Sequence, residues 1–397
     1  MENISRADQT TITILTIAAF CSMAALRIAD PLLPVIAAEF DIGTGGASGV
    51  VSAFAIAYGL SQFLIGPMAD RFGKLFILSL ALAMSVAANI AVAMSEEFTT
   101  IVVLRAVAGA TTAAIIPVSI AWIGETIAYG VRQATLARFL FGVLFGMIGG
   151  QLVGGICADI GHWRAGFFIL ALFYLACLLL LMRSGRARRQ NAPPHAAGHA
   201  LGHLANVLSV PWARTMLLTV GIEGLMLYGA VVFIPAFLHE RLDIRLTAAA
   251  GIMSALAAGG MLYAFTAPKL LARLGEQGLI RWGSRVLGLA FLLIILTGHW
   301  LVAGVAVFMV GLGMYMLHNT LQTMATQMVP DSRSTAVSLF ACCIFLGQAV
   351  GVSMAGWVID LHGISSIFWL PAIGLPLLGL AFGKLVSRRA IQHDPRT

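Results

Sequence analysis

Long apolar runs of about 20 residues alternate with short polar stretches along the whole chain, and we count twelve such runs. A helix rises about 1.5 Å per residue, so a run of this length crosses a hydrocarbon core of about 30 Å. The pattern therefore predicts an all-α integral membrane protein with twelve transmembrane helices. The expected ranges are 12–36, 46–66, 75–94, 100–123, 136–158, 165–183, 212–238, 247–268, 279–298, 301–327, 334–358 and 364–384.

A polar stretch from Ser184 to Pro211 separates the first six runs from the last six. Three arginines, a Pro-Pro pair and several small residues make it typical of a linker. We therefore predict two pseudo-symmetric six-helix bundles, 1–183 and 212–397, which are joined by a cytoplasmic linker, 184–211.

A shorter polar stretch, Gly66 to Lys74, lies between the second and third runs, and we expect it to form a turn between adjacent helices. Gly66 and Gly73 suit the tight backbone geometry of such a turn. A degenerate copy, from Ala267 to Gly275, follows the eighth run. This echo indicates that the two halves are internal repeats.

Composition and charge agree with a membrane protein. Apolar residues make up 59% of the chain, against about 45–50% in soluble domains, and charged residues only 10%, against about 25%. With the N-terminus inside, 19 of the 24 basic residues fall on the cytoplasmic side. The net charge of +7 is then explained by topology rather than by nucleic-acid binding. We expect a multi-pass protein of a bacterial inner membrane with both termini in the cytoplasm.

Three motifs resemble those of the major facilitator superfamily, and the resemblance covers nearly the whole chain. In the Gly66 to Lys74 stretch, Asp70, Arg71 and Gly73 stand at the positions characteristic of the family signature. Arg105 in the fourth run, with Gly109 and Pro117, resembles a motif of proton-coupled members. The fifth run contains four glycines that resemble the Gly-rich antiporter motif of the family: Gly146, Gly150, Gly154 and Gly155.

The resemblance implies two bundles that rock about a central cavity in alternating access. Trp163-Arg164 and Phe167 are also typical of drug-efflux members. One position departs from the pattern, because Gln151 follows Gly150 where antiporters have proline. The fifth helix therefore need not kink as it does in the family's antiporters, which leaves the direction of transport open.

Four ionisable residues lie within predicted spans: Arg27, Asp30, Arg105 and Glu223. Each costs roughly 2.5–3.5 kcal/mol to insert, so each calls for an explanation. Arg27 and Asp30 share a helix face, and Arg105 is expected at a similar depth. We expect Asp30 to bind and release a coupling proton. A nearby cation favours the charged form of a carboxylate, whereas burial favours its neutral form. The alternatives are direct recognition of an anionic substrate and a static ion pair.

Glu223 stands near the middle of the seventh run, with no basic residue within one helical turn. We predict that it binds a cationic substrate or carries a second proton. The alternative is a neutral, hydrogen-bonded acid or one that faces a wet cavity.

The tenth run is unusually polar for a lipid-embedded helix. Tyr315, His318, Asn319, Gln322 and Thr323 recur at spacings of three and four, which places most of them on one face. We predict that this face lines the substrate cavity, where His318 contacts substrate or titrates near neutral pH. Hydrogen bonding between helices is the alternative.

Three further side chains, Gln151, Trp122 and Tyr228, are weaker cavity candidates. An interfacial aromatic belt would explain Trp122 equally well.

Charges near the cytoplasmic helix ends are interpreted as a gate. Asp70 and Arg71 belong to the predicted turn with Lys74, and Glu125 and Arg132 flank the end of the fourth run. Breaking such a network would favour an inward-open state. The alternative is that these charged residues only set the orientation of the helices in the membrane.

The remaining expectations concern chemistry and class. No nucleotide-binding loop or catalytic constellation occurs, and His195, His199 and His203 lack further ligands, so no enzyme, metal or cofactor is expected. Proton-coupled efflux of drugs or metabolites is the first choice, and proton-coupled or facilitative uptake of a nutrient or cofactor is the second. A membrane-embedded enzyme or lipid flippase is a third class. The expected partners are a small-molecule substrate, protons and lipid, with the protein a monomer.

Overall fold

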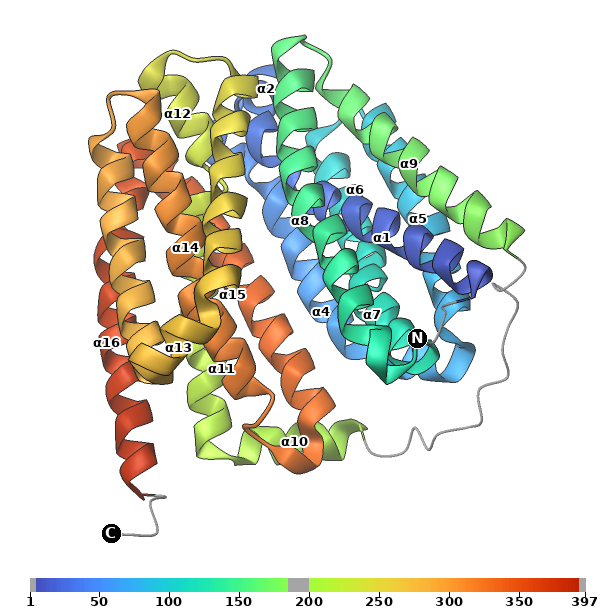
Figure 1. Ribbon diagram of the computed structural model, residues 1–397. Coiled ribbons are helices and arrows are strands. Elements are labelled where there is room, and N and C mark those ends of the chain that lie inside the picture. Colours follow the sequence, from blue (N-terminus) through green and yellow to red (C-terminus); the bar gives the residue numbers. More distant parts are fainter. Residues whose placement is uncertain (1–4, 185–199, 393–397) are drawn as a thin grey trace. The chain divides into compact units, whose positions relative to one another are not determined.

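The computed structural model describes residues 5–184 and 200–392, and this part of the chain is helical almost throughout (Figure 1). The helices of the first half are α1 (Arg6–Arg27), α2 (Leu33–Glu39), α3 (Thr44–Ala47), α4 (Gly49–Phe72), α5 (Lys74–Met94), α6 (Phe98–Thr112), α7 (Ile115–Thr126), α8 (Tyr129–Asp159) and α9 (Trp163–Arg183). Those of the second half are α10 (Ala200–Ser209), α11 (Pro211–Val231), α12 (Ile234–Leu242), α13 (Leu246–Leu296), α14 (Trp300–Ala325), α15 (Arg333–His362) and α16 (Trp369–Gln392).

Eleven helical segments of the described residues are long and apolar enough to cross a membrane. One of them, α13, has 51 residues and contains Gly275, whose φ of 63° and ψ of 175° are not helical. Gly275 divides α13 into two arms, which correspond to the predicted eighth and ninth spans. The expected twelve transmembrane helices are therefore present.

The chain divides into two compact units, Met1–Ala200 and Leu201–Thr397, and each is described here by itself. The end of the predicted linker forms α10. His195 and His199 lie outside the described residues, as does the side chain of His203.

The prediction of a turn from Gly66 to Lys74 was wrong in its extent. Helix α4 continues through Gly66 and Pro67 to Phe72, and only Gly73, with φ of 92° and ψ of 136°, leaves the helical conformation. A positive φ is the conformation that glycine adopts without steric cost. Gly275 occupies the corresponding place in the second unit, so both copies of the stretch turn on a single glycine.

Glycines of α8 let its backbone pack directly against α1. A methyl group on Gly150 would lie 2.6 Å from Ala24 Cα, and one on Gly146 would lie 2.9 Å from Phe20 Cα. Gly154 packs in the same way beside Ile28, and Gly155 is also buried. Close contact through small residues is the usual way in which membrane helices associate.

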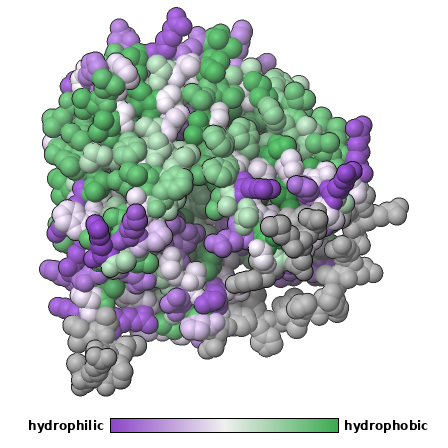
Figure 2. Space-filling view, in the orientation of Figure 1, coloured by the Kyte–Doolittle hydropathy of each residue, from purple (hydrophilic) through white to green (hydrophobic). Residues whose placement is uncertain are grey.

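The second unit repeats this packing between α15 and α11. A methyl group on Gly351 would lie 2.8 Å from Leu225 Cα, and one on Gly347 would lie 2.9 Å from the Gly221 carbonyl carbon. Large hydrophobic side chains on the helices' other faces remain exposed, as Figure 2 shows for the broad hydrophobic surface. Such a surface is suited to lipid.

Candidate functional site

Asp30 lies at a break in the first membrane-crossing segment, Arg6–Glu39. Helix α1 ends at Arg27, and a 3₁₀ turn, η1 (Asp30–Leu32), connects it with α2. Pro31 explains the break, because it has no N–H to continue the hydrogen-bond ladder and disfavours helical backbone at the residue before it. The Asp30 side chain is fully buried.

Two donors meet one oxygen of this carboxylate. Gln151 Nε2 of α8 donates to Asp30 Oδ2 at 2.9 Å, and Arg27 Nη1 lies 3.5 Å from the same oxygen. The other oxygen, Oδ1, is buried and has no hydrogen-bond partner among the residues that the structure describes. The predicted pairing of Arg27 with Asp30 is therefore present, and Gln151 joins it; we call these three residues the Asp30 cluster.

This contact gives a physical role to the residue that departs from the antiporter motif. Gln151 stands where that motif has proline, and α8 runs from Tyr129 to Asp159 as one helix. Because glutamine keeps the backbone N–H, the helix need not kink at this position. Its amide group also supplies a donor that proline lacks.

Arg105 of α6 is fully buried, but its hydrogen bonds go to backbone rather than to Asp30. Its Nε donates to the Val50 carbonyl and its Nη2 to the Ala25 carbonyl, both at 3.2 Å. The guanidinium carbon lies 4.3 Å from the centre of the Phe54 ring, an arrangement that favours a cation. Arg105 thus ties α6 to α1 and α4 beside the Asp30 cluster.

Glu223 of α11 is not unpaired, contrary to the expectation from its neighbours in sequence. Its Oε2 lies 3.2 Å from His318 Nδ1 of α14, and the carboxylate is fully buried. The Phe340 ring of α15, with its centre 5.4 Å from that of the imidazole, also positions His318. The structure thus joins two residues that the sequence suggested separately.

The other α14 residues that were predicted to line the cavity are partly or fully exposed. Asn319 and Gln322 are exposed, and Tyr315 is half-buried against Gly260. On α11, the Tyr228 hydroxyl donates to Met314 Sδ at 3.6 Å.

Trp122 of α7 is buried, so it does not belong to an exposed aromatic belt. Among the described residues, no group of three or more His, Cys, Asp or Glu side chains gathers in a way that would hold a metal ion.

Lys74 is the centre of the predicted cytoplasmic gate. Its Nζ lies 2.7 Å from Glu125 Oε1 and 3.5 Å from Asp70 Oδ1. Glu125 therefore joins the network as expected. Arg71 lies over the Phe72 ring at 5.3 Å, and Arg132 Nε donates to the Ile127 carbonyl at 3.1 Å.

A second charge cluster, which the sequence did not reveal, lies at the ends of α2, α5 and α9. Glu39 Oε1 is 2.6 Å from Arg164 Nη1, and Glu39 Oε2 accepts from Trp163 Nε1 at 2.5 Å. Arg164 Nη2 also donates to the Ser95 carbonyl at 3.0 Å. The Trp163-Arg164 pair was noticed in the sequence, but its partner Glu39 could not be, because it lies 124 residues from Trp163 in the chain.

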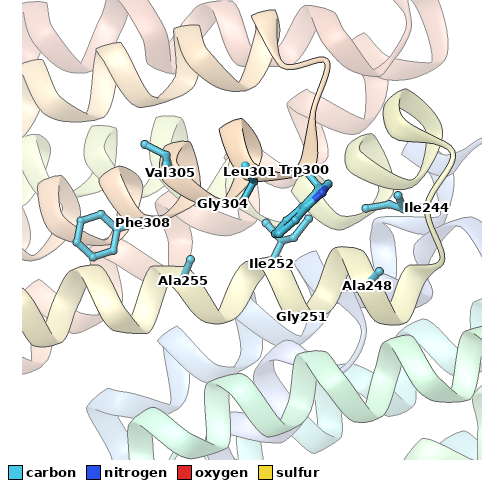
Figure 3. A pocket seen from close by; sticks show the side chains of 10 residues that line it. All are labelled: Ile244, Ala248, Gly251, Ile252, Ala255, Trp300, Leu301, Gly304, Val305 and Phe308. Carbon is cyan, nitrogen blue, oxygen red and sulfur yellow. The ribbon is translucent and has the colours of Figure 1, made fainter.

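The second unit also contains an apolar groove of about 670 Å³ between α13 and α14. Figure 3 shows Trp300 over Ile252, with Phe308 further along α14. The lining residues are Ile244, Ala248, Gly251, Ile252, Ala255, Trp300, Leu301, Gly304, Val305 and Phe308. None of them carries a charge, so the groove cannot neutralise a charged solute.

Eleven membrane-crossing segments among the described residues, one of them divided at Gly275, with buried ionisable side chains in each unit, are typical of multi-span membrane transporters. The sequence profile of the Major Facilitator Superfamily matches residues 15–352 and 283–396. The chain therefore belongs to the Major Facilitator Superfamily, and it is a transporter rather than an enzyme.

Relatives and solved structures agree with this assignment. The uncharacterized MFS-type transporter YceJ of Bacillus subtilis (strain 168) is 23% identical over 83% of this chain and 84% of that protein. The quinolone resistance protein NorA of Staphylococcus aureus (strain MSSA476) is 22% identical over 88% of this chain and 89% of that protein.

A crystal structure of a mutant of the nucleoside transporter NupG is similar in fold, with a TM-score of 0.80. It is 15% identical and matches over 94% of this chain and 98% of that chain. A bacterial homolog of the human lysosomal transporter Spinster, in an inward-facing and unoccupied conformation, has a TM-score of 0.77 at 17% identity, over 99% and 100% of the two chains. At these identities the likeness shows the fold alone.

Proposed function

We propose that the protein exports small organic solutes, such as drugs or metabolites, in exchange for protons, and that Asp30 carries the coupling proton. The observation that carries the proposal is the environment of this carboxylate. Asp30 is fully buried at a helix break, with Arg27 and Gln151 on one oxygen and no partner on the other among the described residues.

Such an environment suits reversible protonation. The charged form is stabilised by Arg27 and by the Gln151 amide, while burial favours the neutral form. A change in helix packing that moves either donor away shifts the balance between the two forms. Alternating access would supply that change, because it exposes the site first to one side of the membrane and then to the other.

The pair of Glu223 and His318 supports a role for the second unit in binding the solute or a second proton. A buried carboxylate beside an imidazole attracts a cation when the imidazole is neutral. Protonation of the imidazole would satisfy the carboxylate internally and lower its attraction for a cationic solute. The pair therefore favours organic cations among the possible substrates.

The first experiment expresses the wild type and Asp30→Asn in an efflux-deficient bacterium and measures survival against toxic cations, antibiotics and metabolite analogues. Glu96→Gln, which changes an exposed carboxylate just beyond the end of α5, is the matched control. We expect protection by the wild type and the control and none by Asp30→Asn. In proteoliposomes, Asp30→Asn should keep part of its solute exchange but lose transport driven by a pH gradient. Retention of the pH-dependence in this variant would refute the proton role.

Uptake of a nutrient or cofactor is the second candidate, and one observation favours it. Helix α8 runs unbroken past Gln151, so the proline of the antiporter motif is missing at the helix that contacts Asp30. In the same survival assay, an importer would sensitise cells to a toxic analogue instead of protecting them.

A further inference from the structure

Five basic residues lie on two helices of the second unit that pack against each other, two on the second arm of α13 and three in the last turns of α16. We call this group the basic corner, and its members are Arg281, Arg285, Lys384, Arg388 and Arg389. Figure 1 shows the end of α16 near the C-terminus, and in Figure 2 hydrophilic residues replace the hydrophobic surface in that region. In the segments 276–296 and 369–392 the only acidic residue is Glu276.

Specific contacts hold the two helices together at this corner. Gln277 Nε2 of α13 donates to the Gly383 carbonyl of α16 at 2.9 Å. Arg281 lies directly on the α16 backbone, because a methyl group on Gly383 would be 3.0 Å from both Arg281 Cγ and Arg281 Nε. The position of the Arg281 side chain is therefore set by packing.

Arg281 lacks a counter-ion in the part of the chain that the structure describes. Its Nε is buried and has no hydrogen-bond partner there. Partly buried charges are normally paired, and like charges on neighbouring helices repel one another. An anion from outside the chain would pair with Arg281 and would also reduce the repulsion between the neighbouring cations.

Two tryptophans lie against arginines of the basic corner, as is typical of the level of lipid headgroups. Arg389 lies over the Trp212 ring with its guanidinium carbon 4.5 Å from the ring centre, and Arg285 lies over Trp282 at 5.0 Å. Trp282 is half exposed. Tryptophan is enriched at membrane–water interfaces, because its apolar ring can lie in the lipid while its N–H contacts water.

The same two helices continue from the basic corner into an exposed apolar face. Leu289 and Leu296 of α13 and Ile373 and Leu377 of α16 each expose half or more of their surface. A ligand that fits both parts has an anionic head and long hydrocarbon chains. Free phosphate or a nucleotide would fill only the charged part.

We propose that the basic corner is a binding site for an anionic phospholipid, with Arg281 and Arg285 contacting the phosphate and the acyl chains lying along α13 and α16. A cluster of basic residues next to the end of a membrane helix attracts anionic lipid, and each added cation strengthens the attraction. The proposal does not depend on the direction or coupling of transport.

The test measures lipid binding by the purified full chain in detergent, by native mass spectrometry and by thermal unfolding. Phosphatidylglycerol is compared with phosphatidylethanolamine and with inorganic phosphate. We expect phosphatidylglycerol to bind more tightly than phosphatidylethanolamine and to raise the unfolding temperature. Equal binding of the two lipids, or the same stabilisation by inorganic phosphate, would overturn the proposal.

Substitutions locate the site. Arg281→Gln and Arg285→Gln should each weaken phosphatidylglycerol binding about fivefold, as expected for the loss of one basic residue near an anionic headgroup. Arg273→Gln removes an exposed cation from the first arm of α13 and is the matched control, which should bind as the wild type does. Arg285 is exposed, so its variant keeps the test valid if Arg281→Gln does not fold. Equal affinities in all three variants would contradict the assignment.

Discussion

Replacing Gly150 with alanine should separate α8 from α1 and disturb the Asp30 cluster. The new methyl group would lie 2.6 Å from Ala24 Cα and closer still to the Ala24 carbonyl oxygen. Carbon atoms pack best at about 3.5–4.0 Å, so the two backbones must move apart by about 1 Å. The contact is with backbone, which cannot rotate away as a side chain would.

The same shift acts on the neighbouring residue. Gln151 Nε2 is 2.9 Å from Asp30 Oδ2, and a displacement of about 1 Å would take the two atoms beyond hydrogen-bond distance. Overpacking costs about 1–3 kcal/mol, and the lost bond to a charged group about 1.5–3 kcal/mol. Alanine regains about 0.5–1 kcal/mol in helix propensity. The expected net loss is therefore about 2 kcal/mol or more.

Thermal unfolding of the purified protein in detergent measures this loss. For a cooperative unit of about 200 residues, 1 kcal/mol corresponds to about 2–4 °C, so the midpoint should fall by about 4 °C or more. Gly251→Ala is the control, because this helical glycine of α13 has nothing within 4 Å of a new methyl group. Its midpoint should stay or rise slightly.

A Gly150→Ala protein that melts within about 1 °C of the wild type would refute the argument from close helix packing, since the expected fall is several times larger. A protein that melts lower but keeps the wild-type pH-dependence of transport would refute the link between this packing and the Asp30 cluster.

Two further substitutions test the other clusters. Lys74→Met removes ion pairs with Asp70 and Glu125, whose side chains are largely exposed, so stability should change by about 1 kcal/mol or less. Its effect should instead be on the predicted gate, seen as changed labelling of a cysteine introduced on α7 next to Glu125; unchanged labelling would count against a gating role. Glu223→Gln should raise the KM for cationic substrates more than for neutral ones, because it removes the buried charge beside His318. An equal change for both kinds of substrate would argue against charge recognition.

The twelve crossings and their approximate bounds were predictable from the sequence, because lipid requires each span to be a continuous apolar helix that satisfies its own backbone. Single residues were predictable where the effect is local. Gly73 and Gly275 end helices through their own backbone conformation, and Arg27 lies one helical turn from Asp30.

Only the tertiary structure decided which distant side chains meet. Gln151 reaches Asp30 across 121 positions, and His318 reaches Glu223 across 95. These contacts depend on how one helix is rotated and shifted against another, and hydrophobicity constrains that choice weakly when lipid and protein interior are equally apolar. The sequence determined how often the chain crosses the membrane and where its costly polar groups lie, whereas close packing of helices determined their partners.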